Sequence, residues 1–338
     1  MQLSDIKYLL VTTLAFTTLS AEANKPFAHV PTTVSPMAQQ LLKTVTPSSE
    51  KIESIAQWKK VRETFNNNKI KMNTLMQKKY IQNSEHIHIG GVPVLLSIPK
   101  SYTKSKNILI YIHGGAYTLG GIDSNYVGFA PLAYATGLKT YLIHYRLAPE
   151  HPFPAGLEDT FKVYKKLEKQ YGAKHIVMLG DSAGGALCLA TLLKARQAGI
   201  DLPAALVLYS PWSDIDKIGD SYYTLENIAP LLHYEKNLRD SAKVYAQNHD
   251  MKNPLISPVY ADYNASFSPT LIQIGTRDLF LSNSARLYRK MKEGGSDVEL
   301  SLWEGMWHVF QSIPNLPEAE EAVKEASNFI KSKLKETH

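Results

Sequence analysis

The chain has 338 residues, of which 44% are hydrophobic and 20% charged, which is ordinary for a globular protein. Its formal net charge is +6 at pH 7, but the 37 Lys and Arg are scattered and often adjoin acids, as in Glu168-Lys169. No run of five basic residues occurs, so we expect a solvated basic surface and no nucleic-acid partner. A single cysteine, Cys188, excludes an intramolecular disulfide. It lies in an apolar helical pattern without metal-ligand spacing, so we expect a buried small side chain and no metal.

The N-terminus resembles an export signal. Lys7 precedes an apolar, Thr-rich stretch at 8–19, and an A-x-A pattern ends at Ala23. Residues 1–23 are therefore expected to be a cleaved signal peptide, which would place the mature protein in the periplasm or outside the cell. Asp5 in the charged region argues against export. An uncleaved anchor, a plain N-terminal helix and a cytoplasmic location remain alternatives.

Residues 24–85 are expected to form an N-terminal helical cap segment. The pattern is helical from Ser35 to about Asn68, where three consecutive asparagines predict a break. From His86 onward, alternating residues and Gly90-Gly91 predict a β-hairpin that enters a sheet.

Residues 86–338 alternate between short apolar runs and helical patterns. The expected strands are 107–111, 139–145, 175–179, 204–209, 270–274 and 298–303. The expected helices are 157–170, 183–198, 283–293 and 318–334. This alternation predicts an α/β fold with a mostly parallel sheet and helices on both faces. A polar helical stretch at about 212–262 interrupts the rhythm and is expected to be a cap insertion.

The pattern Gly180-Asp181-Ser182-Ala183-Gly184 follows an expected strand and opens an expected helix. In that context G-x-S-x-G is a nucleophile elbow: its glycines permit a tight turn that holds the serine strained and exposed. We predict that Ser182 is a nucleophile. Asp181 is expected to be structural.

A serine hydroxyl needs a base and an orienting acid, which follow it in the chain in this kind of fold. Only one downstream histidine, His308, closely follows an expected strand; the others are His233, His249 and His338. For the acid we prefer Asp278, four residues beyond Ile274 at the end of a strand. Asp262 and Asp297 lack such a position.

The segment His113-Gly114-Gly115-Ala116-Tyr117 directly follows the first strand of the alternating series. Its small residues let a ligand approach the main chain, as the N–H donors of an oxyanion hole require. We expect those donors at Gly114, Gly115 and Ala116. His113 is expected to brace the loop.

Five segments together resemble the hormone-sensitive-lipase-like esterases of the α/β-hydrolase superfamily: residues 113–117, 145–155, 180–185, 210–214 and 304–310. The resemblance implies Ser182 as nucleophile, Asp278 as acid and His308 as base. It also implies oxyanion donors at Gly115, Ala116 and Ala183, and a cap formed by helices around 35–68 and 222–247. Two departures from the family pattern are Ala116 in place of a third glycine, and Asp278-Leu279-Phe280 where the family usually has Asp-Pro-Leu.

These observations predict a carboxylesterase that cleaves small-molecule esters through an acyl-enzyme, without metal or cofactor. Apolar cap residues such as Leu41, Leu225, Leu231 and Leu232 are expected to favour short-to-medium acyl chains. No membrane contact is required, and a homodimer is compatible with the sequence. Lactonase, deacetylase or amidase chemistry with the same triad remains an alternative. A catalytically dead ligand-binding relative is disfavoured because all three triad positions are filled.

Overall fold

The computed structural model describes residues 29–44 and 54–336. Within these residues, eight strands form one sheet in the order β1-β2-β4-β3-β5-β6-β7-β8. β1 pairs antiparallel with β2, and β2 pairs antiparallel with β4, whereas all further pairs are parallel. The strands are β1 (Ile81–Ile89), β2 (Val92–Pro99), β3 (Ile108–Ile112), β4 (Lys139–Ile143), β5 (Ile176–Asp181), β6 (Ala205–Tyr209), β7 (Thr270–Gly275) and β8 (Val298–Trp303).

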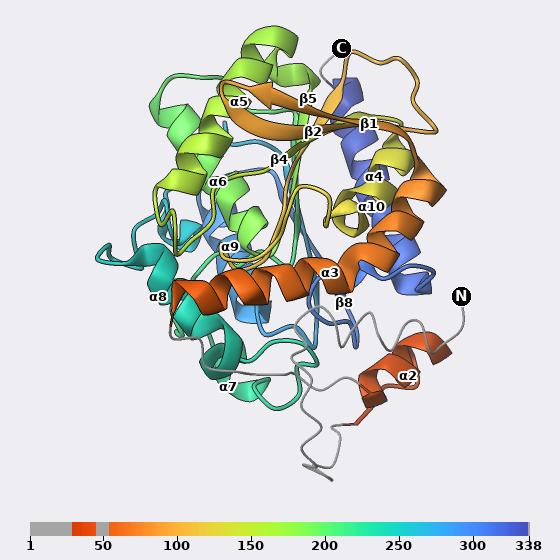
Figure 1. The fold of residues 1–338 in the computed structure, drawn as a ribbon, viewed down its shortest axis with the longest axis vertical. Coiled ribbons are helices and arrows are strands. Elements are labelled where there is room, and N and C mark those ends of the chain that lie inside the picture. Colours follow the sequence, from red (N-terminus) through yellow and green to blue (C-terminus); the bar gives the residue numbers. More distant parts are fainter. Residues whose placement is uncertain (1–28, 45–53, 337–338) are drawn as a thin grey trace.

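Helices cover both faces of this sheet, as the sequence predicts (Figure 1). α5 and α6 lie on one face, and α4 and α10 pack against each other on the opposite face. The bounds are α4 (Tyr126–Thr136), α5 (Ala155–Tyr171), α6 (Ala183–Gln197), α9 (Leu281–Glu293) and α10 (Pro317–Glu336). α4 was not among the predicted helices, and Pro131 lies inside it. The α/β class with a mostly parallel sheet is confirmed.

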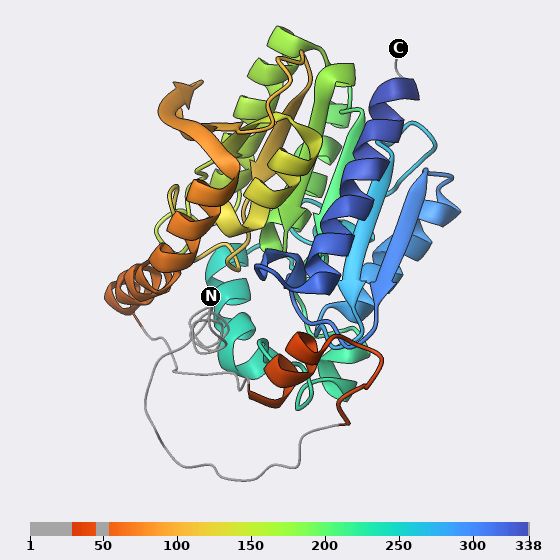
Figure 2. The ribbon, with the colours of Figure 1, turned by 90° about the vertical axis from the view of Figure 1, so that its right-hand side faces the viewer.

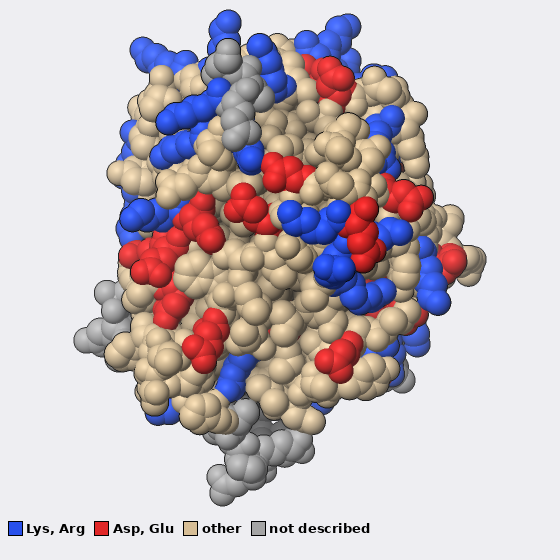
Figure 3. Space-filling view, turned by 180° about the vertical axis from the view of Figure 1, so that it is seen from behind, with Lys and Arg blue, Asp and Glu red and all other residues tan. Residues whose placement is uncertain are grey.

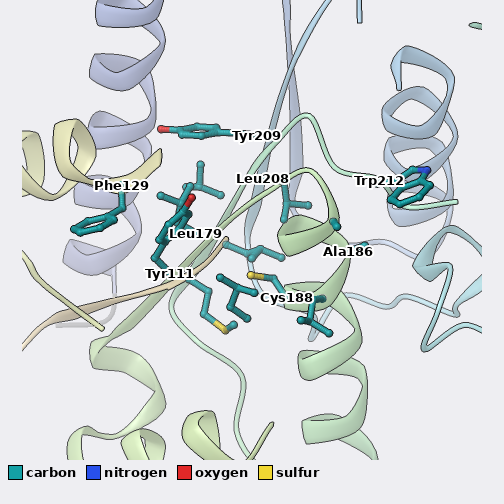
Figure 4. Close-up of a cluster of buried hydrophobic side chains, with 14 of the residues drawn as sticks. Tyr111, Phe129, Leu179, Ala186, Cys188, Leu208, Tyr209 and Trp212 are labelled. Carbon is teal, nitrogen blue, oxygen red and sulfur yellow. The ribbon is translucent and has the colours of Figure 1, made fainter. Parts of the chain in front are cut away.

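The central strands are buried along their whole length, which explains their continuous apolar sequence. Figure 4 shows side chains from β3, β5, β6 and α6 packed into one cluster. Cys188 lies in this cluster and is fully buried as a free thiol, as predicted. The core therefore fixes the strand ends from which the loops after β3, β5 and β6 emerge.

The expected helix break at Asn66-Asn67-Asn68 is wrong. α3 runs without interruption through the asparagines over Ile55–Tyr80. Each asparagine costs only about 0.7 kcal/mol relative to alanine, and two contacts with the main body offset this cost. Asn66 Oδ1 accepts a hydrogen bond from Ser124 Oγ at 2.9 Å, and the buried Asn73 donates to Ser124 O at 2.9 Å.

The N-terminal segment divides into two parts that lie apart. α3 packs along α4, whereas α2 (Pro36–Thr44) lies near the loops after β8 and the start of α10 (Figure 2). Ser35 N donates to Glu318 Oε1 at 2.6 Å, which ties the start of α2 to α10. Residues 24–85 therefore do not form one continuous helical unit in their described part. The proposed signal peptide, residues 1–23, lies outside the described residues.

Residues 212–262 contain only short helical pieces: α7 (Ser221–Thr224), the π-turn η2 (Tyr234–Leu238), α8 (Arg239–Ala246) and η3 (Pro258–Tyr260). Many of their side chains are buried aromatic or aliphatic groups, including Trp212, Tyr222 and Tyr245. The buried side chains of this stretch are therefore mostly apolar, although its sequence as a whole is polar.

Figure 3 shows both Lys and Arg and Asp and Glu on one face of the molecule, with uncharged surface between them. The helices within the described ranges include none that is both long enough and apolar enough to cross a membrane.

Candidate active site

Ser182 occupies the turn between β5 and α6 with φ 54° and ψ −124°, a backbone conformation that residues other than glycine rarely adopt. The flanking glycines are required by close packing. A Cβ at Gly180 would lie 2.5 Å from Gly184 O, and a Cβ at Gly184 would lie 2.1 Å from Ile112 O. The strand-turn-helix context predicted from the sequence is therefore present, and Ser182 is held strained at its apex.

The main chain of Ser182 is fixed by the end of the neighbouring strand β6. Its N–H donates to Tyr209 O at 2.9 Å, and its carbonyl accepts from Trp212 N at 2.9 Å. Such strain costs on the order of 1–3 kcal/mol and persists only where the surroundings hold it. These hydrogen bonds supply that support.

His308 and Asp278 meet at the ends of β8 and β7. His308 Nδ1 lies 3.1 Å from Asp278 Oδ2 and 3.2 Å from Oδ1. The Asp278 side chain is fully buried, and its Oδ1 also accepts from Phe280 N at 2.9 Å. The His308 ring stands edge-on to Phe280. A carboxylate at Nδ1 keeps the proton on that nitrogen and leaves Nε2 as the acceptor.

Two backbone features set the position of His308. A Cβ at Gly275 would lie 2.0 Å from Met306 O, so only glycine permits the two loops to approach this closely. The next residue after His308, Val309, has φ 51°, and its N–H donates to the buried Ser210 Oγ at 3.0 Å. The sequence did not identify Ser210 as a support for this loop.

The other histidines and aspartates that were considered as base or acid have different partners from His308 and Asp278. His233 contacts Glu226 at 3.2 Å, and His249 packs against the Phe153 ring. Asp262 is exposed beside Lys290, and Asp297 pairs with Lys333. His338 lies outside the described residues.

The loop after β3 presents free main-chain N–H groups. The hydrogen bonds of the described residues leave the N–H groups of Gly115, Ala116 and Ala183 without an acceptor. Ala183 is the first residue of α6, where an N–H has no partner within the helix. Gly115 has φ 110°, and a Cβ there would lie 2.4 Å from Leu119 O, so the loop needs glycine at this position.

Gly114 differs from the prediction that it is a donor. Its N–H donates to Asp181 Oδ1 at 3.0 Å and is therefore already engaged. Asp181 Oδ1 also accepts from Tyr111 Oη at 2.5 Å. The aspartate thus holds the loop against the strand that precedes the serine. Burial raises the pKa of Asp181, although the Tyr111 hydrogen bond and the charge of Lys69 oppose this shift.

His113 braces the same loop from inside the core, as predicted. Its Nδ1 lies 2.7 Å from Gly114 O, and its ring stacks on Tyr145 with 4.5 Å between centroids. Burial lowers the pKa of His113 to about 3, so the ring is neutral at physiological pH. A neutral ring donates from Nδ1 to the carbonyl and carries no charge toward the site.

Ser182, His308, Gly115 and Ala116 line one cavity. α3 contributes Phe65 and Lys69 to its wall. The other lining residues are Tyr111, Leu119, Asn125, Val127, Gly128, Asp181, Leu231, Leu232, Leu238, Val309, Ser312 and Ile313. Leu231 and Leu232 therefore lie where the sequence analysis expected them. Leu41 and Leu225 are not among the lining residues, and Leu41 belongs to the distant α2.

Comparison with known proteins agrees with this geometry. The family described as "alpha/beta hydrolase fold" matches residues 109–312, more than half of the chain. The chain belongs to the α/β-hydrolases. An acetyl-hydrolase of Streptomyces hygroscopicus is 35% identical over 66% of this chain and 75% of its own length. An esterase of Acinetobacter venetianus is 31% identical over 69% and 77%. A crystal structure of a bacterial hormone-sensitive-lipase-family esterase is 30% identical, covers 89% of this chain and 99% of its own, and has a TM-score of 0.78.

This α/β-hydrolase is accordingly a carboxylesterase-type enzyme of the hormone-sensitive-lipase-like group, as the resemblance implied.

Within it, α3 is tied to the oxyanion loop by Arg62. The Arg62 guanidinium donates to Thr118 O at 2.8 Å and Ala148 O at 3.0 Å, and pairs with Glu150 at 2.9 Å. Glu150 belongs to the segment 145–155 that carries much of the resemblance, and Arg62 lowers its pKa.

An aromatic stack links α8 of this hydrolase to the oxyanion loop and to the loop that carries His308. Tyr245 of α8 stacks on Tyr117 with 3.6 Å between centroids, and Tyr117 stacks in turn on Trp212. Trp212 stacks on Phe280, which touches His308. This chain of contacts has no signal in the sequence, because its members come from α8 and four separate loops.

Proposed function

We propose that this esterase hydrolyses short-to-medium acyl esters with Ser182 as nucleophile, His308 as base and Asp278 as the orienting acid. One observation carries the proposal: the strained Ser182 shares a cavity with His308, whose Nδ1 lies 3.1 Å from the buried Asp278 carboxylate. Ser312 also lines this cavity, but its hydroxyl donates to Val309 O at 2.8 Å.

The mechanism is a two-step acyl transfer. Ser182 Oγ attacks the ester carbonyl carbon while His308 Nε2 takes its proton, and Asp278 stabilises the resulting imidazolium. The free N–H groups of Gly115, Ala116 and Ala183 stabilise the oxyanion. The carbon–oxygen bond to the alcohol then breaks, and the alcohol leaves with the proton from His308. Water, deprotonated by His308, releases the acid and restores Ser182.

The preference for short-to-medium chains rests on the walls of the cavity. Leu119, Val127, Leu231, Leu232, Leu238 and Ile313 offer apolar contacts. Each buried CH₂ contributes about 0.8 kcal/mol while room remains, whereas overpacking costs about 1–3 kcal/mol. An optimum at intermediate length follows. The name of the Streptomyces relative, an acetyl-hydrolase, supports activity on small acyl groups.

The test is kcat/KM for p-nitrophenyl esters from acetate to palmitate, with Ser182→Ala as the background control. We expect a maximum between butyrate and octanoate, a steep fall beyond it, and a loss on the order of 10⁴- to 10⁶-fold in the variant. A profile still rising at palmitate would contradict the length limit, and full activity in Ser182→Ala would contradict the nucleophile.

Deacetylation with the same triad is a second candidate, favoured by the same relative's name. Comparing p-nitrophenyl acetate with p-nitroacetanilide separates the two. Faster turnover of the anilide would make deacetylation of amines the main activity.

We also propose that residues 1–23 are removed on export, which rests on the sequence pattern alone. N-terminal sequencing of protein from its native host tests this. A mature chain that begins at Asn24 is expected, and an intact Met1 would contradict it.

A further inference from the structure

Lys69 brings an ammonium group to the active-site cavity from α3. It lies one turn beyond Phe65, and both side chains line the cavity that contains Ser182. Lys69 Nζ stands over the Phe65 ring, 4.1 Å from its centroid. Among the described residues the Lys69 ammonium makes no hydrogen bond and no ion pair. The catalytic sequence described above does not use it.

The opposing charge that acts on Lys69 is that of Asp181, whose Oδ1 is already engaged. Its Oδ1 accepts hydrogen bonds from Tyr111 and Gly114, and burial raises its pKa. Burial also lowers the pKa of Lys69 to about 8, while Asp181 acts in the opposite direction. At pH 7 the ammonium is therefore mostly charged in a largely apolar cavity. A charge in such a place is costly until an anion accompanies it.

An ordinary explanation is that the lysine stem covers apolar surface while its head reaches water. Two features argue against this. The side chain is only partly exposed, unlike its neighbour Lys71, and its head group rests on an aromatic ring that itself lines the cavity. An ammonium held there is placed to meet a substrate.

We propose that Lys69 is a specificity-determining residue that binds a carboxylate carried by the ester substrate. The preferred substrates are then half-esters of dicarboxylic acids, or esters with an acidic alcohol portion, in place of simple fatty-acid esters. This inference rests on the proposed function, because it needs Ser182 to attack the ester while the carboxylate occupies the Lys69 side of the same cavity.

The experiment compares two substrate pairs that differ in one carboxylate. Mono-p-nitrophenyl adipate is paired with p-nitrophenyl hexanoate, and 4-carboxyphenyl hexanoate with phenyl hexanoate, each corrected for spontaneous hydrolysis. The first pair places the carboxylate on the acyl side and the second on the alcohol side. The acid-to-neutral ratio of kcat/KM, measured in wild type and in Lys69→Met, isolates the interaction between the ammonium and the carboxylate.

We expect Lys69→Met to lower the ratio about 10-fold or more for one of the two pairs, as loss of a charge-assisted hydrogen bond does. The neutral ester is the denominator of each ratio, so a general effect of the substitution on turnover cancels. Lys60→Met is the matched control: it removes an exposed lysine of the same helix and the same net charge, and both ratios should stay unchanged. A ratio that Lys69→Met leaves unchanged for both pairs, or that Lys60→Met lowers equally, would overturn the proposal.

The wild-type protein alone supplies a second test, which does not depend on a variant that folds. Because the pKa of Lys69 is lowered to about 8, its positive charge is present below that pH and lost above it. The acid-to-neutral ratio should therefore fall as pH rises from 7 to 9. The other titratable groups at the cavity and its loop are Asp181, Tyr111, His113 and His308. Using a ratio removes effects of these groups that act equally on both substrates.

Lys69→Arg, whose charge persists at pH 9, should keep the ratio constant over this range. A wild-type ratio that rises between pH 7 and 9 would contradict the proposal. The two proposals fail separately. Loss of the carboxylate preference with normal hydrolysis of p-nitrophenyl hexanoate removes only the role of Lys69. A wild type that does not hydrolyse the hexanoate removes the esterase mechanism itself.

Discussion

The catalytic loops and the segments that cover them are held in place by different kinds of contact. The loops around Ser182 and His308 are fixed by main-chain hydrogen bonds and by glycines packed against carbonyl oxygens, as at Gly275. α3 and α8 are held mainly by side chains, such as Arg62, Asn73 and the stacked Tyr245. Small changes in the loops should therefore abolish the chemistry, whereas changes in the covering segments should alter binding and selectivity.

The largest effect in this comparison is expected for Asp278→Asn. An asparagine keeps the shape but favours the wrong tautomer of His308, so kcat should fall about 10⁴-fold with folding preserved. Steady-state kinetics and circular dichroism measure the two quantities. Asp262→Asn serves as the control, because its side chain is exposed beside Lys290, and it should stay within about 2-fold of wild type. Full activity in Asp278→Asn would move the acid's role to another carboxylate.

Gly114→Ala should have the next largest effect. The added Cβ would lie 2.4 Å from Asp181 Oδ2 and 2.9 Å from Ser182 Cβ, so the oxyanion loop must shift. Misplaced donors cost on the order of 10²- to 10³-fold in kcat. Gly199→Ala, where nothing lies within 4 Å of the new Cβ, should leave kcat unchanged. Equal kcat in the two variants would show that the loop is not rigid.

Arg62→Met tests the covering segments. It removes three contacts that join α3 to the oxyanion loop and to Glu150, so the cavity wall should loosen. We expect KM to rise about 3- to 10-fold with kcat changed less, because a loosened wall weakens binding in the ground state and the transition state alike. Arg289→Met removes an exposed arginine from α9 and should change neither constant. A fall in kcat alone would place α3 among the groups that position the catalytic loops.

The smallest expected effect concerns the three asparagines of α3. Asn67 is exposed, and among the described residues its side chain makes no hydrogen bond that would offset its poor helix propensity, so Asn67→Ala should stabilise the protein by about 0.5 kcal/mol. Asn66→Ala loses the hydrogen bond from Ser124 and should destabilise it by about 1 kcal/mol. Chemical denaturation measures both. The same sign for the two variants would mean that helix propensity alone governs this stretch.

Short sequence patterns predicted those features of the fold and the site that depend on residues close together in the chain. The turn at Ser182 needs glycines at fixed offsets, and buried parallel strands need continuous apolar runs, so both were visible in the sequence. The predicted helix ends too early, at about Asn68, because Asn66 and Asn73 form their hydrogen bonds with a residue more than 50 positions away in the chain. Gly114 was misassigned for a similar reason: its N–H is occupied by Asp181, which no spacing reveals. Lys69 and Ser210 were missed because their positions depend on how α3 and the loop after β6 pack.

The most direct test of the central claim is peptide mapping of the protein after reaction with a fluorophosphonate. Such a reagent phosphonylates a serine only where a base activates it next to an oxyanion hole. We expect one adduct per chain, located on Ser182, and a strong loss of labelling in Asp278→Asn. An adduct on another serine, or no adduct on protein that hydrolyses p-nitrophenyl hexanoate, would contradict the account.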